Sequence, residues 1–202
     1  MELFNREEVR DIIISVAAIS IIFAYPHILD AVILLTSFFA VVIAFLLHEL
    51  AHKFVAIKFG ATAFFKMWPQ GIVFGFLLML ITGGFKFLAP GAVMIYPYKF
   101  SRYGQRKLNL DQTEYGIIGA AGPLVNISFA ALFSGLFSVF QFVPFLQISL
   151  INAFLGFFNL LPIPPLDGSK VMKWKPWLWL LLIITPLLLL ISQYALYSSY
   201  FF

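Results

Sequence analysis

The sequence predicts an all-α polytopic membrane protein that folds as one domain over residues 1–202. Three observations predict this class: 62% of the residues are hydrophobic, only 11% are charged, and long uncharged stretches recur along the chain. A soluble domain has about 45–50% apolar residues and about 25% charged ones. The chain is therefore expected to lie in a lipid bilayer without a large soluble module. It contains no cysteine, which excludes disulfides and thiolate metal sites.

About five to six transmembrane helices are expected. A helix needs about 20 apolar residues to cross the hydrocarbon core of a bilayer. Apolar stretches of about that length cover residues 12–28, 31–59, 115–140, 145–161 and 177–197. The densely charged residues 1–11 are expected to be solvated or interfacial.

The hydrophobic pattern of residues 71–98 does not by itself distinguish a full membrane crossing from a shorter segment. The stretch "GIVFGFLLMLITGGF" is apolar but short for a full crossing, and its paired glycines interrupt it. "KFLAPGAVMIYPY" follows, with β-type residues around a Pro-Gly turn. We expect a helix or half-helix followed by an extended or hairpin segment, together forming a re-entrant excursion. Residues 99–114 are expected to be a polar loop.

Lysine and arginine predict the orientation in the membrane. Basic residues gather in three places: after the second expected helix, before the helix at 115–140, and after the proline-rich break near residue 165. Basic loops favour the cytoplasmic side, so an even number of crossings is expected between residues 60 and 114. The chain is thus expected to be a multi-pass cell-membrane protein with a cytoplasmic N-terminus and an external C-terminus. Its net charge of +4 is interpreted as a topology signal, with no nucleic-acid partner.

Two histidines and a glutamate lie near the inner end of the second expected helix, in "AFLLHELAHKF". On a helix, His48 and His52 lie one turn apart on the same face, so both imidazoles can hold one metal ion. Glu49 lies next to the first of them and can take a proton from a water that the metal activates. This HExxH arrangement is typical of zinc metalloproteases.

A second interpretation needs no metal. The uncharged residues 31–47 rise roughly 25 Å as a helix, which places His48 near the inner edge of the hydrocarbon core. Polar side chains are less costly there, so the three residues would form an interfacial polar face. His27, beside Pro26 at a helix end, is expected to be interfacial in either case.

A catalytic zinc needs a third protein ligand and an open position. Asp167, in "FNLLPIPPLDGSK", is an acidic residue embedded in apolar sequence, just beyond an expected helix. The prolines before it break that helix and free main-chain groups, which is tolerated at membrane depth only inside protein or in a wet cavity. An aspartate that caps the next helix at an interfacial turn explains the same pattern, and the residues alone leave both interpretations open.

These motifs carry a resemblance to a known family. "HELAH" late in an apolar helix, "GAAGPLVN" in another and "FNLLPIPPLDG" at the end of a third resemble the site-2 protease family of intramembrane zinc metalloproteases. "FKFLAPGAVMI" resembles the membrane-inserted β segment of that family, and the similarity extends over about residues 31–175. The chain resembles the small forms that have no PDZ-like or CBS-like domain.

The resemblance implies roles for residues at the matching positions. It implies one zinc ion per chain, bound by His48, His52 and Asp167, with Glu49 as the general base. Asn159, in "FNLLP", matches an asparagine thought to contact the substrate peptide or the developing oxyanion. One further position, Asn126 in "GPLVN", has a supporting role in the family. The chain departs from the family in having "DGSK" in place of the commoner "DGGR".

The function expected from this resemblance is hydrolysis of a peptide bond in or near a transmembrane segment of a substrate protein. A helical substrate hides its carbonyls in hydrogen bonds, so the enzyme is expected to bind an extended segment. The alternative is a non-catalytic membrane scaffold or metal-handling protein that retains the zinc site. The presence of Glu49 favours catalysis, because a site that only holds metal needs no base. The sequence itself names no substrate and sets no oligomeric state.

Overall fold

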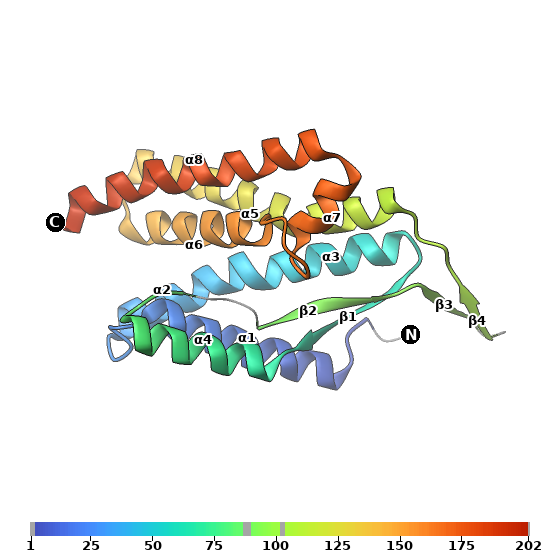
Figure 1. Ribbon diagram of the computed structural model, residues 1–202. Helices are drawn as coiled ribbons and strands as arrows, with labels where there is room; N and C mark the ends of the chain where they lie inside the picture. Colours follow the sequence, from blue (N-terminus) through green and yellow to red (C-terminus); the bar gives the residue numbers. More distant parts are fainter. Residues whose placement is uncertain (1–2, 87–89, 102–103, 202) are drawn as a thin grey trace.

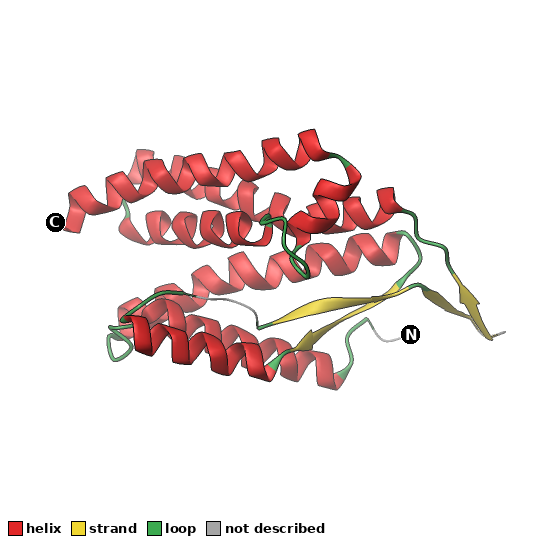
Figure 2. Ribbon diagram, viewed as in Figure 1, coloured by secondary structure: helices red, strands yellow, loops and turns green. Residues whose placement is uncertain are grey.

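The computed structural model describes residues 3–86, 90–101 and 104–201 and is mostly helical (Figures 1 and 2). The first half of the chain contains α1 (Arg6–Ala24), α2 (Ala31–Val41), the π-helical turn η1 (Val42–Leu46), α3 (Leu47–Lys58), β1 (Thr62–Met67), α4 (Pro69–Thr82) and β2 (Gly91–Tyr96). The second half contains β3 (Tyr98–Ser101), β4 (Gly104–Lys107), α5 (Gln112–Phe140), α6 (Val143–Asn159), α7 (Asp167–Trp174) and α8 (Pro176–Phe201).

Three of the described helices are long and apolar enough to cross a membrane. They cover Ala31–Lys58, Gln112–Phe140 and Pro176–Tyr194, with 28, 29 and 19 residues. Two shorter apolar helices, Pro69–Thr82 and Val143–Asn159, lie between them. The structure therefore has the character of a helical membrane protein. Three of its described helices qualify as spans by length and composition, and the expected count of five to six stays a prediction.

The helices form two groups with the long helix between them. In Figure 1, α5, α6 and α8 lie together on one side, α1, α2 and α4 lie on the other, and α3 runs through the middle beside β1 and β2. Buried apolar side chains of α1, the π-turn region and α6 make one core, which includes Ile19, Phe45, Ile151 and Leu155. This core supports the helix that carries the two site histidines.

Side-chain caps and a glycine mark several helix ends. Asp30 caps α2 by accepting from Val32 and Ile33 N–H, and α5 begins with a capping box formed by Asp111 and Glu114. Gly60, with φ of +85°, ends the long helix in the left-handed region that glycine adopts without steric cost.

Strand β2 pairs in antiparallel fashion with β1, although α4 separates the two strands in the sequence. This pairing was not expected from the sequence. The register brings Thr62 beside Tyr96 and Met67 beside Gly91. The connection from β1 to β2, which contains α4, therefore begins and ends at the same end of the two-stranded sheet. The expected polar loop at 99–114 is also wrong in part, since residues 98–107 contain the antiparallel hairpin of β3 and β4.

The charged N-terminal segment is built into the fold, and the expectation of a solvated start is wrong for two of its residues. Glu8 and Asp11 are 2% and 7% exposed. Glu8 accepts hydrogen bonds from Lys53 Nζ at 2.6 Å and from Phe65 N–H at 2.9 Å, and Asp11 accepts from Met67 N–H at 3.1 Å. The two carboxylates thus fasten α1 to α3 and to the outer edge of β1.

Candidate metal centre

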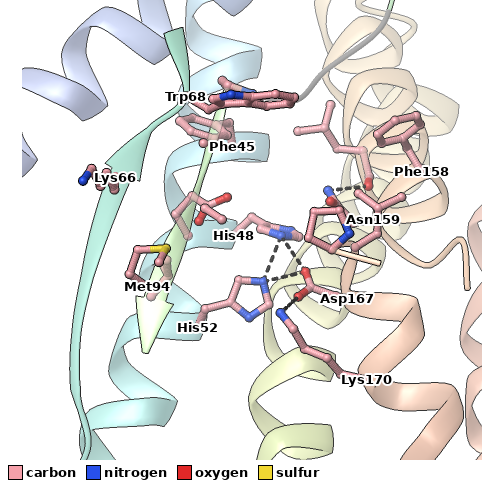
Figure 3. Close-up of a pocket in the computed structure, with 18 of the residues that line it drawn as sticks. Phe45, His48, His52, Lys66, Trp68, Met94, Phe158, Asn159, Asp167 and Lys170 are labelled. Carbon is pink, nitrogen blue, oxygen red and sulfur yellow. Dashed lines mark hydrogen bonds and ion pairs between the residues drawn. The ribbon is translucent and has the colours of Figure 1, made fainter. Parts of the chain in front are cut away.

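Three buried side chains from two distant parts of the chain converge on one point (Figure 3). His48 and His52 lie on α3, and Asp167 is the first residue of α7. Asp167 Oδ2 lies 2.8 Å from His52 Nε2 and 3.4 Å from His48 Nε2. The two Nε2 atoms lie 3.0 Å apart. The helical spacing of the histidines and the proline-broken segment before Asp167 together produce this group.

The other nitrogen of each imidazole has its own acceptor. His52 Nδ1 lies 2.7 Å from the carbonyl oxygen of Ile118, and His48 Nδ1 lies 2.6 Å from Asn126 Oδ1. A carbonyl oxygen only accepts, so each Nδ1 donates its proton. A neutral imidazole with its proton on Nδ1 carries a lone pair on Nε2. Two lone pairs and a carboxylate oxygen therefore face one another.

A cation satisfies such a group of converging acceptors, and the donor set suits zinc. Two imidazole nitrogens and one carboxylate oxygen are the ligands of several catalytic zinc sites. The three ligand atoms lie within 4.8 Å of one another. Space beside the imidazoles is kept open by Gly122 of α5, because a Cβ there would lie 2.6 Å from His48 Nε2 and closer still to His52 Nε2. The residues present therefore fit a zinc ion.

A chain of amides fixes the ring of His48. Asn126 Nδ2 donates to the carbonyl of Ala44 at 2.7 Å and to Asn152 Oδ1 at 3.2 Å, which leaves its own Oδ1 to face the histidine. Ala44 lies in the π-turn η1, a kind of turn that often occurs at functional sites. Asn126 and Asn152 are both fully buried. Such outer partners orient metal ligands and set their tautomer.

Contacts of the residues that flank the proline-rich break fix the position of Asp167. Leu166 is the N-cap of α7, so Asp167 is not the capping residue of the alternative interpretation. The missing Cβ of Gly168 lets its backbone pass against the carbonyl of Leu160, which also accepts from Trp179 Nε1 at 2.7 Å. The end of α6 and the start of α8 thereby hold the turn that carries the carboxylate.

A cavity of about 720 Å³ opens onto this group, between β2, α3 and the proline-rich turn. Glu49 and Asn159 line it together with the three converging residues. Glu49 Oε2 is buried, and no hydrogen-bond partner for it occurs among the described residues. Asn159 Nδ2 donates to the carbonyl of Leu155 in its own helix at 3.0 Å. All five residues expected at the site thus border one cavity.

Sequence reasoning missed Asn152, although a signal was present. It is an amide in an apolar helix, where a buried polar group needs a partner. No such signal pointed to the main-chain carbonyl of Ala44 as the acceptor for Asn126, because an alanine in an apolar helix indicates only packing.

Comparison with known proteins agrees with this geometry. The chain is 42% identical over 181 residues to the Methanocaldococcus jannaschii protein named "Putative zinc metalloprotease MJ0611", with 87% of this chain and 88% of the relative covered. No protein-family model and no solved structure matches the chain. Identity at this level over most of both chains shows common descent. With its His-His-Asp group, the chain therefore belongs to the zinc metalloprotease family of this archaeal relative.

Proposed function

We propose that the protein is an intramembrane zinc endopeptidase of the site-2 protease type, which hydrolyses a peptide bond in or near a transmembrane segment of a substrate protein. One observation carries the proposal. Glu49 Oε2, which has no hydrogen-bond partner in the described part of the chain, borders the same cavity as the three converging acceptors, and this cavity lies in a mostly apolar helical protein. A site that only stores metal needs no carboxylate beside its ligands.

The residues divide the chemistry between them. His48, His52 and Asp167 hold the zinc ion, one per chain, and a bound zinc supplies Lewis-acid activation of water and of the scissile carbonyl. Glu49 is the general base: its Oε2 accepts the proton that the attacking water loses and passes it to the leaving amine. Asn159 offers an amide N–H to the peptide or to the oxygen on which charge develops.

The outer edge of β2 provides a place for an extended substrate. Phe65 N–H points away from β2, toward Glu8, so in this antiparallel pair its partner Val93 points its own N–H and C=O away from β1. The Val93 main chain lies beside the Glu49 carboxylate. A substrate segment that adds to this edge as a strand has its main chain bound next to the base.

The proposed placement is a multi-pass cell-membrane protein, with its N-terminus in the cytoplasm and its C-terminus outside. The two termini lie at opposite ends of the molecule in Figure 1. The return of β2 alongside β1 supports an excursion from one side of the bilayer between residues 60 and 98. The basic residues around this excursion then lie on the cytoplasmic side.

Glu49→Gln tests the proposal in purified, zinc-loaded protein. General-base catalysis contributes about 10²–10⁴-fold, so the variant should cleave a membrane-spanning substrate at least about a hundredfold more slowly. It should bind zinc as well as the wild type, because Glu49 is not a ligand. Glu7→Gln, at an exposed position, is the matched control and should cleave normally. A chelator should stop cleavage by the wild type and by the control.

Cleavage by Glu49→Gln at the wild-type rate would refute the role of Glu49 as base. If the wild type binds zinc but cleaves none of a panel of membrane substrates, the non-catalytic scaffold or metal-handling function is the correct one.

A further inference from the structure

Lys170 contacts the metal-site aspartate on the side away from the histidines. It lies on α7, and its Nζ donates to Asp167 Oδ1 at 2.8 Å (Figure 3). The other oxygen, Oδ2, is the one that lies near the two histidine Nε2 atoms, at 2.8 and 3.4 Å. The two oxygens of one carboxylate thus have separate partners.

The position of Lys170 is built into the packing of α5 against α7. Gly119 on α5 lies under the lysine stem, and a Cβ there would lie 3.0 Å from Lys170 Cβ and 3.2 Å from its Cδ. The same Cβ would lie 3.4 Å from the main-chain oxygen of Asp167. A glycine at this position lets the stem and the aspartate backbone approach the helix together. The Lys170 side chain is 35% exposed and borders the cavity, whereas that of Asp167 is 9% exposed.

A carboxylate can bind a metal through one oxygen or through both. A catalytic zinc site keeps three protein ligands and leaves a further position open for water or substrate. If Asp167 bound through both oxygens, the second would compete for that position. A cation that already holds Oδ1 prevents this, because Oδ1 would have to give up a charge-assisted hydrogen bond in a largely buried place.

We propose that Lys170 is a positioning residue that reserves Asp167 Oδ1 and so limits the aspartate to one metal-binding oxygen, Oδ2. The inference rests on the metal site of the proposed function. Arginine, which stands at this place in the commoner "DGGR" motif, can make the same charge-assisted bond.

Cobalt(II) in place of zinc reports coordination number directly, because four-coordinate cobalt absorbs visible light more strongly than five- or six-coordinate cobalt. The experiment uses the full-length protein in detergent, stripped of metal and titrated with cobalt. Lys170→Met should bind one cobalt ion but lose absorption intensity, because Oδ1 becomes free to ligate. Lys170→Arg should restore the wild-type spectrum. Lys173→Met removes an exposed lysine from the same helix and should leave the spectrum unchanged.

Metal affinity separates this role from simple support of the aspartate. If Lys170 only held Asp167 in place, its loss would weaken metal binding by about 10–100-fold, as loss of an outer-shell partner does. Under the proposal the affinity of Lys170→Met is not reduced, since Asp167 gains a ligating oxygen and a nearby positive charge is removed. Weakened binding with an unchanged spectrum would therefore overturn the proposal. A spectrum identical to that of Lys173→Met would overturn it as well.

The spectrum and the affinity do not depend on cleavage. Absence of cobalt and zinc binding in the wild type would refute the metal site and this role together. Normal metal binding without cleavage of any substrate would refute only the protease function, and the role of Lys170 would stand or fall on the spectrum alone.

Discussion

Gly122→Ala should weaken zinc binding, because the added Cβ would overlap both site histidines. Gly122 lies in α5, facing the two imidazoles across the site. An added Cβ would lie 2.6 Å from His48 Nε2, whereas ordinary contact begins at 3.4 Å. Relief of that overlap requires the ring to move by about 0.8 Å. His52 Nε2 lies still closer and has to move further.

This displacement is large on the scale of metal coordination. Metal–ligand distances in a competent site stay within about 0.2 Å of their ideal values, and a misplacement of about 1 Å can cost about a hundredfold in rate. Gly122 precedes Pro123 inside α5, and a Cβ before a proline disfavours the helical backbone, so some loss of helix stability is expected as well. The variant should bind zinc at least about tenfold more weakly, as when ligand orientation is lost, and cleave substrate about a hundredfold more slowly.

Zinc content by mass spectrometry, competition with a chromophoric chelator and thermal melting measure these effects. Gly135→Ala is the matched control, because it lies in the same helix and a Cβ there meets nothing within 4 Å. It should retain zinc and activity. Wild-type zinc affinity in Gly122→Ala would show that Nε2 of these histidines is not where the metal binds, and the reasoning about the site would fail.

Three further perturbations test the surroundings of the site. Glu8→Gln leaves a buried lysine unpaired and should destabilise the protein by about 3–5 kcal/mol in a thermal melt, whereas Glu7→Gln, at an exposed position, should not. Asn126→Leu should weaken zinc binding by about 10–100-fold and also destabilise the protein, because each buried partner left without a hydrogen bond costs about 1–3 kcal/mol; normal affinity would contradict the amide chain. Cysteines introduced at Lys173 and Leu29 test topology in intact cells: an impermeant thiol reagent should label Leu29→Cys and spare Lys173→Cys, and the reverse pattern would invert the proposed orientation.

The parts of the structure that depend on local pattern could be predicted from the sequence. The helix expected at 31–59 corresponds to α2, η1 and α3, which end at Lys58. The spacing of His48 and His52 placed both on one face, because a helix sets that geometry by itself. Asp167 was found because a carboxylate in apolar sequence needs a partner, although the two histidines that it meets lie on another helix.

Features that depend on contacts between distant segments could not be predicted. Strand β1 pairs with β2 although the whole of α4 lies between them in the sequence, and no local signal specifies that partner. The buried pair of Glu8 and Lys53 joins residues 45 positions apart, so the charged N-terminal segment had the composition of a solvated one. The π-turn η1 adds a residue to a helical turn within an apolar stretch, and such a stretch has the same hydrophobic pattern with or without it.

The hydrogen-bond partners of the buried polar atoms explain why the three converging residues suit a cation. Asn126 uses its oxygen and both amide hydrogens, and Asn152 both accepts from Asn126 and donates to its own helix. Each Nδ1 of the two histidines has an acceptor. In a protein interior, where polar groups are costly to leave unpaired, these bonds hold the imidazole protons away from the centre. The two imidazole lone pairs and Asp167 Oδ2 face one another, and a cation bound among them offsets their mutual repulsion.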